Sequence, residues 1–330
     1  MEQFNVAING TGRIGLCACR LLGKNKNIKL VAINSTTPID TLVHLLKYDT
    51  VHRFFDAEKV NEDTIRIGEQ IVKVVSDRDP LKIPFGQLGA EIVLECTGAF
   101  NSKEKATAHL REGVKKVIIS APADNTPTFV YGVNHQTYNG EQVISNASCT
   151  TNALAPLVKI LHIHYGIQSG LMTTVHSYTN DQNLLDVKHK DVRRARAAAL
   201  NIIPTSTGAA KAIGLVIPEL SGLLNGFSVR VPTPDVSLVD LNVQLKKHTS
   251  KEEINDLMRQ MSQVEFANLV AVDEERCVSS DFIGSTYSSI FIPDCTQVVD
   301  KNHAKVIAWY DNEMGYTARL IDMATFVATR

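Results

Sequence analysis

The segment FNVAINGTGRIGLCACRLLGK, residues 4–24, decides the fold. It begins with an apolar run over residues 4–9, continues with Gly10, Gly12 and Gly15, and ends in a helix-like stretch. In this G-x-G-x-x-G pattern the glycines allow a tight turn and a close backbone approach to a pyrophosphate, which the N-terminus of the helix then holds. The order of strand, turn and helix predicts a dinucleotide-binding unit. The alternative is a glycine-rich turn without a ligand.

Apolar runs alternate with helix-like stretches through the first half of the chain. Buried strands are expected at residues 28–35, 90–98 and 115–123, a hairpin over 66–76 and a helix over 102–113. Strands that alternate with helices are typical of a parallel, doubly wound sheet. We therefore expect a Rossmann domain of the α/β class over residues 1–148.

The pattern changes after residue 148, where longer strand candidates follow one another with few helices between them. These candidates lie at residues 170–179, 225–234, 236–245, 287–293 and 305–311. Such a succession predicts a mostly antiparallel sheet, and hence an α+β catalytic domain over residues 149–312. Residues 313–330 have a helical pattern and are expected to pack back on the first domain.

Two segments of the second half have distinct patterns. Residues 250–264 are amphipathic, with Ser250 as the N-cap and Glu253 at the position of a capping box, which predicts a helix. Residues 180–207 show no regular pattern and are expected to form one long loop. Loops of that length are usually functional or disordered.

The composition limits the classes of function. The chain has 330 residues, which favours two domains, and its 44% apolar and 21% charged residues are ordinary globular usage. The chain has 34 basic and 35 acidic residues, and its net charge of -1 favours neither nucleic acid nor an anionic membrane as a partner. No apolar run reaches about 18 residues, and the first residues do not resemble a signal peptide. We expect a cytoplasmic protein without a membrane span.

The six cysteines show no C-x-x-C spacing and no accompanying histidine cluster, so we expect free thiols and no metal site. Cys149 lies in SNASCTTNALAPLVKIL, residues 145–161, where a helix is expected to begin. A helix N-terminus stabilises a thiolate, because its free N–H groups favour negative charge. Cys149 is therefore either an inert core residue or a nucleophile. The neighbouring hydroxyls of Ser148 and Thr150 favour the nucleophile, because such donors suit an anion.

A thiolate nucleophile needs an imidazole that exchanges protons with it. His176 is the candidate, because it ends a predicted strand just before the long loop. Arg230 within a strand could clamp an anion, and Thr207 and Gly208 offer a hydroxyl and a backbone N–H. The basic run over residues 188–196 is either part of an anion site or a solvated or subunit-facing loop.

The choice of cofactor remains open at the end of the second strand. A carboxylate about 20 residues after the glycines typically binds the ribose hydroxyls of NAD. Ser35 occupies that place here. A serine neither chelates the ribose nor repels a 2′-phosphate, so the residues allow both NAD and NADP.

Five blocks together resemble the phosphorylating glyceraldehyde-3-phosphate dehydrogenase family. They are SNASCTTN (145–152), TTVHSYTND (173–181), IIPTSTGAAKA (202–212), RVPTP (230–234) and WYDNEMGY (309–316). The resemblance runs over essentially the whole chain. It implies phosphate-dependent oxidation of glyceraldehyde 3-phosphate to 1,3-bisphosphoglycerate with NAD and/or NADP, in glycolysis or gluconeogenesis, by a homotetramer.

The resemblance also implies roles for individual residues. Cys149 would be the nucleophile, and His176 the base that forms an ion pair with it. Substrate and phosphate contacts would come from Ser148, Thr150, Thr179, Arg196, Thr207, Gly208 and Arg230. Cofactor contacts would come from Gly10, Gly12, Arg13, Ile14, Gly15, Ser35, Arg78, Thr97, Ser120, Lys188 and Asn312. Within these sets, Thr179 and Arg230 would bind the phosphate of the substrate, and Asn312 the nicotinamide amide.

The sequence departs from the usual family pattern at several positions, namely Thr11, Leu16, Ser35, Val187–Lys188 and Ala153. Ser35 replaces an acid, and Lys188 replaces a proline in a loop that the family places near the adenosine end of the cofactor. Ala153 replaces a second cysteine. Two rival functions remain: an erythrose-4-phosphate dehydrogenase of the same family, and a surface- or RNA-binding protein whose catalysis is incidental.

Overall fold

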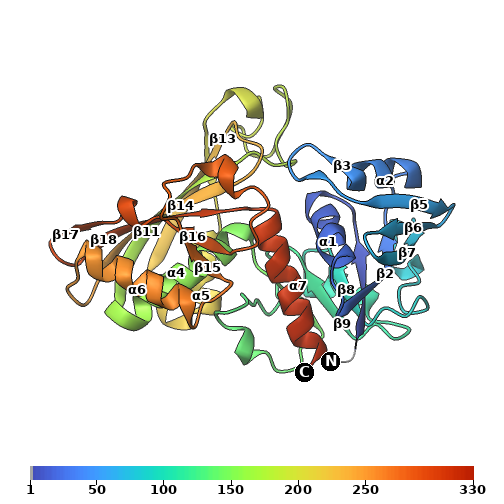
Figure 1. Cartoon of the computed structure of the whole chain (residues 1–330), viewed down its shortest axis with the longest axis horizontal. Helices are drawn as coiled ribbons and strands as arrows, with labels where there is room; N and C mark the ends of the chain where they lie inside the picture. Colours follow the sequence, from blue (N-terminus) through green and yellow to red (C-terminus); the bar gives the residue numbers. More distant parts are fainter. Residues whose placement is uncertain (1–2) are drawn as a thin grey trace. The chain divides into compact units, whose positions relative to one another are not determined.

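The computed structural model describes residues 3–330 and divides into two compact units (Figure 1). Unit 1 comprises the residues up to Tyr131, His135–Ser148 and Thr317–Arg330. Unit 2 comprises Gly132–Asn134 and Cys149–Tyr316. The chain visits unit 2 briefly at Gly132–Asn134, enters it again at Cys149, and returns to unit 1 within its last helix.

Unit 1 is built on an eight-stranded sheet with the order β10-β9-β8-β1-β2-β7-β6-β5. The strands from β10 to β7 are parallel neighbours, and β5, β6 and β7 pair antiparallel. This arrangement confirms the doubly wound parallel sheet. The bounds are β1 Phe4–Asn9, β2 Ile28–Asn34, β5 Ala57–Asn61, β6 Thr64–Ile67, β7 Gln70–Val75, β8 Ile92–Glu95, β9 Lys116–Ile119 and β10 Val143–Ser145.

The helices of unit 1 cover this sheet. Helix α1 (Arg13–Gly23) buries Leu16, Cys19 and Leu22, whose spacing of three places them on one face, in a core that also contains strand residues of β1 and β2. Helix α2 (Ile39–Lys47) adds Leu42 and Leu46 to the same core. A two-residue pair, β3 (Tyr48–Asp49) with β4 (Arg53–Phe54), follows α2.

The helix predicted over residues 102–113 is much shorter in the structure. Helix α3 (Lys103–Ala106) has a Ser102 N-cap and is followed by a 3₁₀ turn over Thr107–His109. Helical geometry ends where His109, 2% exposed, lies beside the buried carboxylate of Glu95. A tertiary contact of this kind cannot be read from local periodicity.

Unit 2 contains a second sheet, with the order β12-β13-β11-β14-β18-β16-β15 and with β17 also paired to β18. Most pairs are antiparallel, as expected; β11 with β13 and β15 with β16 are parallel. The bounds are β11 Ile167–Ser177, β12 Ile203–Ser206, β13 Leu224–Val231, β14 Ser237–Leu245, β15 Val270–Val272, β16 Ser289–Phe291, β17 Gln297–Val299 and β18 His303–Tyr310.

The long loop is shorter than predicted, because β12 occupies Ile203–Ser206 within it. This edge strand pairs antiparallel with β13, an interaction between segments far apart in the sequence. Pro204 fits an edge strand, where one side of the backbone needs no partner. A 3₁₀ turn over Ala198–Leu200 precedes the strand.

Four helices complete the second half of the chain: α4 Cys149–Tyr165, α5 Ala209–Val216, α6 Lys251–Gln263 and α7 Met314–Ala328. Helix α4 is buried nearly all round its middle turns, including Pro156. Helix α6 confirms the predicted capping box, because the Glu253 N–H donates to Ser250 Oγ at 3.2 Å and the Ser250 N–H donates to Glu253 Oε2 at 2.8 Å. Among residues 3–330, no helix has the combined length and apolar character to cross a bilayer.

Candidate active site and dinucleotide turn

The glycine-rich turn joins β1 to α1 in unit 1. Gly10 has a φ of +96°, and a Cβ on it would lie 2.8 Å from Thr97 Cγ2. A Cβ on Gly15 would lie 2.0 Å from the Gly10 carbonyl oxygen, so only glycine fits there. Gly12 faces open space, because a Cβ on it would meet nothing within 4 Å. It is also the N-cap of α1 and leaves that helix end without a side-chain cap. The turn therefore has the shape and the polarity of a pyrophosphate cradle.

Three predicted cofactor residues lie around this turn. Thr97 lies two residues after the end of the parallel strand β8, and Ser120 directly follows the parallel strand β9. Ile14 lies half-buried in the first turn of α1. Ligands of doubly wound sheets bind outside the carboxyl ends of the strands, which is where Thr97 and Ser120 lie.

A buried polar network that the sequence did not indicate lies below the turn. Glu95, 1% exposed, accepts hydrogen bonds from Asn9 Nδ2 at 2.6 Å and from the Thr97 N–H at 2.8 Å. His109 Nε2 lies 3.0 Å from the same carboxylate. Asn34 Nδ2 donates to Asn9 Oδ1 at 2.7 Å. The network fixes the ends of β1, β2 and β8, which carry the turn.

Arg13, expected to contact the cofactor, forms an ion pair with Asp49. One guanidinium nitrogen contacts Oδ2 closely, and the other lies 3.2 Å from Oδ1. Burial opposes charge on this carboxylate, but the Arg13 hydrogen bond and the backbone N–H groups of Val51 and His52 lower the pKa of Asp49 to about 2. The side chain of Arg13 therefore ties the start of α1 to the chain after α2, and its contact with the cofactor stays a prediction.

Ser35 follows β2 and is 2% exposed. Its Oγ lies 2.6 Å from Thr11 Oγ1 and accepts from the Thr37 N–H at 3.2 Å. Two of the positions at which this chain departs from the family pattern thus contact each other. Two further residues expected to contact the cofactor, Arg78 in unit 1 and Lys188 in unit 2, are exposed.

The nucleophile candidate and its base meet within unit 2. Cys149 is the first residue of α4, and His176 lies at the end of β11. Cys149 Sγ lies 3.5 Å from His176 Nε2. The chain enters α4 through Ala147, which has a φ of +58°, an unusual conformation for a residue with a side chain. Ser148 stands between Ala147 and Cys149.

The imidazole of His176 is 4% exposed and is fixed on its far side. Nδ1 lies 2.7 Å from the Ser177 carbonyl oxygen, which can only accept a hydrogen bond. Arg230 Nη1, which can only donate, lies 2.7 Å from the same Nδ1, so the carbonyl and the guanidinium favour opposite tautomers of the ring. Nε2 is the ring nitrogen that faces the thiol. The geometry therefore suits a base that acts on Cys149.

Arg230 is placed beside His176 by strand register, because the parallel pair β11 and β13 sets these two residues opposite each other. Arg230 Nη1 lies 2.7 Å from His176 Nδ1 and donates to the Ser177 carbonyl at 2.9 Å. Burial and this guanidinium lower the pKa of His176 to about 3. Burial raises the pKa of the Cys149 thiol, an effect that Arg230 partly offsets.

Thr150 contacts a tyrosine that the sequence did not single out. Its Oγ1 lies 2.9 Å from Tyr310 Oη, which is also 2.9 Å from Thr174 Oγ1. The Tyr310 ring stands edge-on to His176, with 6.0 Å between the ring centroids. Thr150 and Tyr310 therefore form a wall of the site. The signal for Tyr310 was present, since it lies within the block WYDNEMGY.

The residues expected to bind phosphate come from three different segments of unit 2. Thr207 and Gly208 precede α5, with Gly208 as its N-cap, and a Cβ on Gly208 would meet nothing within 4 Å. Thr179 follows β11, and its carbonyl accepts from the Gln182 N–H at 2.8 Å. Arg196 is 62% exposed in its side chain, and its Nε donates to Asp186 Oδ2 at 2.6 Å on the outer loop.

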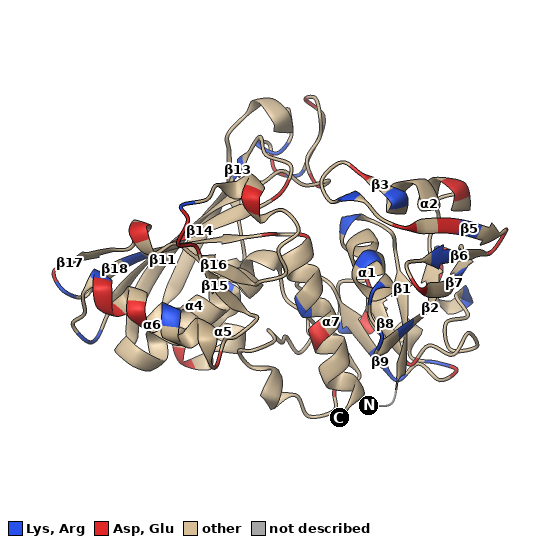
Figure 2. Cartoon of the chain, viewed as in Figure 1, with Lys and Arg blue, Asp and Glu red and all other residues tan. Residues whose placement is uncertain are grey.

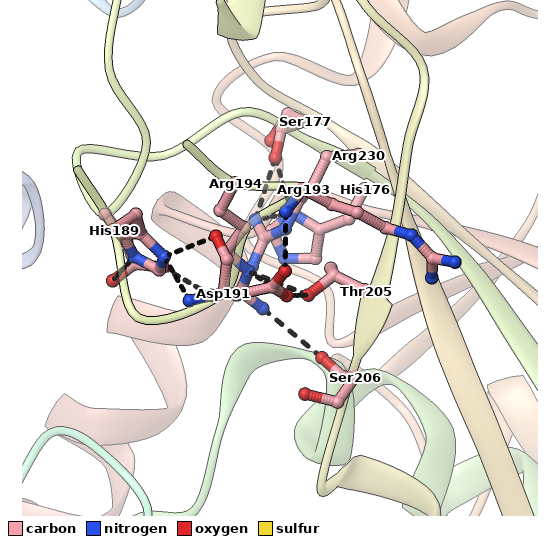
Figure 3. Close-up of polar contacts among 10 residues, drawn as sticks. His176, Ser177, His189, Asp191, Arg193, Arg194, Thr205, Ser206 and Arg230 are labelled. Carbon is pink, nitrogen blue, oxygen red and sulfur yellow. Dashed lines mark hydrogen bonds and ion pairs between the residues drawn. The ribbon is translucent and has the colours of Figure 1, made fainter. Parts of the chain in front are cut away.

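Arg194, not Arg196, is the loop cation near the site. Figure 3 shows Arg194 among the polar contacts that it makes with Asp191, Thr205 and Ser206. Its charge lowers the pKa of His176 and of Arg230, after the larger effects of burial. The two arginines are two residues apart in RRAR, and nothing in their local sequence distinguishes them.

Asn312 is oriented by two serines. Its Oδ1 accepts from Ser177 Oγ at 2.8 Å and from Ser237 Oγ at 2.7 Å. Because the oxygen is used twice, the amide nitrogen is left to donate to a further acceptor. This is the group that the resemblance assigns to the nicotinamide amide.

The sequence matches two family models: "Glyceraldehyde 3-phosphate dehydrogenase, NAD binding domain" over residues 4–103, and "Glyceraldehyde 3-phosphate dehydrogenase, C-terminal domain" over residues 148–312. It is 51% identical over 329 residues to glyceraldehyde-3-phosphate dehydrogenase of Geobacillus stearothermophilus, with 98% of each chain covered. It is 49% identical over 335 residues to chloroplastic glyceraldehyde-3-phosphate dehydrogenase A of Zea mays, which covers 99% of this chain and 83% of that one. The chain belongs to the glyceraldehyde-3-phosphate dehydrogenase family.

Proposed function

We propose that this chain oxidises glyceraldehyde 3-phosphate to 1,3-bisphosphoglycerate, with inorganic phosphate and NAD or NADP. The single observation that carries the proposal is the distance of 3.5 Å between Cys149 Sγ and His176 Nε2, in a protein of this family. A thiol is a soft nucleophile that forms a thioester, and phosphate can attack a thioester. Membership of the family makes the chain an oxidoreductase.

The first step joins the aldehyde to Cys149. Sγ attacks the carbonyl carbon while His176 takes the thiol proton and returns it to the carbonyl oxygen, which gives a thiohemiacetal. The cofactor, when bound, supplies the hydride acceptor that the oxidation requires. As hydride leaves the carbon, His176 takes the hydroxyl proton, and a thioester remains on Cys149.

The second step releases the product. An oxygen of inorganic phosphate attacks the thioester carbon, the carbon–sulfur bond breaks, and the sulfur takes back a proton from His176. The product is an acyl phosphate. Thr179 and Arg230 are proposed to bind the phosphate of the substrate. The attacking phosphate is proposed to bind Ser148, Thr207, Gly208 and Arg194, with Arg194 in place of the Arg196 expected from the sequence.

The dinucleotide turn of unit 1 fits the cofactor. Gly12 faces open space at an uncapped helix N-terminus, where a pyrophosphate would find N–H donors. Ser120 is proposed to offer its hydroxyl at the end of β9. Thr97 is proposed to contribute by its position after β8, because its hydroxyl donates to Glu95 Oε1 and accepts from the Ala99 N–H at 3.0 Å. In unit 2 the Nδ2 of Asn312 is proposed to donate to the nicotinamide amide. Ser35 and Lys188 are proposed to make NADP acceptable beside NAD.

A homotetramer is part of the proposal, and exposed apolar residues on unit 2 support it. The long loop carries five apolar side chains that are each at least 69% exposed: Leu184, Leu185, Val192, Leu200 and Ile202. The open face of the sheet carries Leu171, Val175 and Phe227; the register places Phe227 opposite Thr173, on the same face as the other two. Large exposed apolar patches usually mark protein interfaces.

A cytoplasmic location is proposed because the chemistry needs a reduced thiol and all six cysteines are free. A primary role in RNA binding is not favoured. Figure 2 shows Lys and Arg interspersed with Asp and Glu in both units. Within the basic run, Arg194 pairs with Asp181, and Arg196 with Asp186.

The test compares two aldehydes with and without phosphate. Glyceraldehyde 3-phosphate should give rapid, phosphate-dependent reduction of the cofactor and an acyl phosphate that hydroxylamine traps. Erythrose 4-phosphate should give a kcat/KM at least tenfold lower. A higher kcat/KM on erythrose 4-phosphate, independent of phosphate, would establish the rival activity instead.

A further inference from the structure

A polar cluster on the long loop holds the guanidinium of Arg194 by three contacts (Figure 3). Nε donates to Thr205 Oγ1 at 2.9 Å, Nη2 donates to the Ser206 carbonyl at 3.3 Å, and Nη1 pairs closely with Asp181. The side chain is 16% exposed. An arginine has more N–H donors than these three contacts use, so the group is both oriented and able to bind an anion.

Thr205 is the link between this arginine and the loop. It lies in β12, is 6% exposed, and donates its hydroxyl proton to Asp191 Oδ2 at 2.6 Å. A carboxylate can only accept, so the proton points at Asp191 and the lone pairs of Oγ1 point at Arg194 Nε. The hydroxyl of Thr205 is fully used and cannot itself bind a ligand.

Asp191 is held in turn by the backbone of the loop. Its Oδ1 accepts from the Arg193 N–H at 2.9 Å, and its own N–H donates to His189 Nδ1 at 2.9 Å. Three successive contacts therefore connect a rigid turn to the orientation of one guanidinium. Asp191 is kept ionised, because the Thr205 hydroxyl and the Arg193 N–H lower its pKa.

Strand register brings this cluster to the catalytic residues. Strand β12 pairs with β13 so that Ile203 lies opposite Arg230, and Arg230 in turn lies opposite His176. Thr205 is two residues from Ile203 on the same edge strand. The charge of Arg194 influences the pKa of both His176 and Arg230. Arg194 is thus held within electrostatic reach of the reacting groups.

We propose that Thr205, supported by Asp191, is a positioning residue that aims Arg194 at the attacking phosphate. This inference rests on the proposed function and assigns a role to a residue that touches neither substrate nor cofactor. The proposed role of Thr205 concerns only one of the two steps of the reaction. Thr205 acts on the phosphate step, and acylation of Cys149 with release of hydride proceeds without it.

The test is the isosteric variant Thr205→Val, which removes the hydroxyl and keeps the shape. The KM for inorganic phosphate should rise about tenfold, which corresponds to about 1.4 kcal/mol. The pre-steady-state burst of reduced cofactor, measured without phosphate, should keep its rate and amplitude. Thr205→Ser restores a hydroxyl and should restore the KM for phosphate. Arg194→Gln should raise this KM at least as much as Thr205→Val.

Thr64→Val is the matched control. Thr64 is also a buried strand threonine, 5% exposed, and it donates to an aspartate, Asp63, at 2.7 Å. It lies in unit 1, and its hydroxyl has no arginine to orient among the described contacts. Thr64→Val should leave the KM for phosphate unchanged, which separates positioning from the general cost of deleting a buried hydroxyl.

Two outcomes would overturn the inference. If Arg194→Gln raises the KM for phosphate and Thr205→Val does not, the proposed function stands and the positioning role is wrong. If the unaltered enzyme forms no acyl phosphate at all, the proposed function fails, and the inference fails with it. Should Thr205→Val not fold, Asp191→Asn carries the same test, and an unchanged KM for phosphate in that variant would also contradict the role.

Discussion

Arg230 Nη1 lies 2.7 Å from His176 Nδ1, the ring nitrogen opposite the one that faces Cys149 Sγ at 3.5 Å. One imidazole therefore lies between a cation and a thiol. Burial and the guanidinium lower the pKa of His176 to about 3, and burial raises that of Cys149. Both shifts favour a thiol beside a neutral imidazole, and the ion pair that the resemblance implies stays a prediction. The imidazole can then take the thiol proton when the aldehyde arrives.

The first prediction concerns thiol reactivity. Alkylation of Cys149 by iodoacetamide should accelerate as pH rises from about 7 to 9, because the thiolate form grows toward a raised pKa. The measurement is the pseudo-first-order rate at each pH, with the modified residue identified by mass spectrometry. Cys149→Ser is the control for labelling at this site. Full reactivity already reached near pH 5.5 would instead establish an ion pair.

The second prediction concerns catalysis. Cys149→Ser should abolish aldehyde oxidation without loss of the fold, because a hydroxyl lacks the nucleophilicity of a thiolate. His176→Asn should lower kcat by about 100-fold or more, as loss of a positioned base typically does. His248→Asn, at an exposed histidine of the same unit, is the matched control and should be neutral. Turnover within threefold of normal in His176→Asn would remove His176 from the mechanism.

The third prediction is a pH dependence of stability. The pKa of His176 falls from 6.5 to about 3 on folding, so the unfolded chain binds a proton that the native chain does not between these values. The contribution of His176 to the free energy of unfolding is thus complete above pH 6.5 and is lost as pH falls toward 3. Urea midpoints at pH 7 and pH 5 should differ less for His176→Gln than for the unaltered protein. An equal difference in both would contradict the lowered pKa, and His248→Gln should leave the difference unchanged.

The fourth prediction concerns oxidation. Ala153 is buried in α4 one turn after Cys149, where the family usually has a second cysteine. Peroxide should therefore convert Cys149 to sulfenic acid and then to sulfinic acid, or to a mixed disulfide with an added small thiol. Intact-mass and peptide analysis distinguish these products. Ala153→Cys should introduce an internal disulfide, and finding an internal disulfide of Cys149 in the unaltered chain would refute the prediction.

The fifth prediction is that NADP supports turnover beside NAD. Thr11 and Ser35 have two hydroxyl protons and use one between them, so one proton is left for an oxygen of a 2′-phosphate. No carboxylate stands at Ser35 to repel that phosphate, a repulsion of about 1–4 kcal/mol at surface-like dielectric. Ser35→Asp should raise the KM for NADP at least tenfold and change the KM for NAD little.

Lys188 provides a second, independent arm of this test. Lys188→Pro should weaken NADP more than NAD, since it removes an exposed cation from the long loop. Lys190→Ala, at the exposed lysine two residues away, is the matched control. No measurable turnover with millimolar NADP in the unaltered enzyme would refute the fifth prediction.

The fold was predictable where the signal was local. The turn at Gly10, the longer strands of both sheets and the Ser250 capping box follow from composition and period. Short strands such as β5, β10, β15 and β17 were not expected. Two departures from the expected elements have a tertiary cause. Helix α3 stops early because His109 reaches the buried Glu95, and β12 exists because β13 pairs with it.

In the site, as in the fold, the residues with a local sequence signal were predictable. Cys149 and His176 were expected to act together, and the structure places Sγ and Nε2 3.5 Å apart. The signal was local, because each residue lies beside hydroxyl residues at one end of an expected helix or strand. Arg194 was missed, since two arginines separated by one residue have the same local character and only the folded loop distinguishes them. Glu95 was missed because only its buried hydrogen-bond partners identify it. Tyr310 was missed although it lies within the block WYDNEMGY.

The parallel pairing of β11 with β13 also determines when activity emerges during refolding. Cys149 and His176 are 27 residues apart in the sequence, and His176 and Arg230 are 54 residues apart. Contacts of such separation form after local helices, because the entropy of closing long loops must first be overcome. Regain of turnover should therefore lag behind regain of helical circular dichroism after dilution from denaturant. A collapsed chain with native helices in which β13 is not yet paired with β11 would be catalytically inactive.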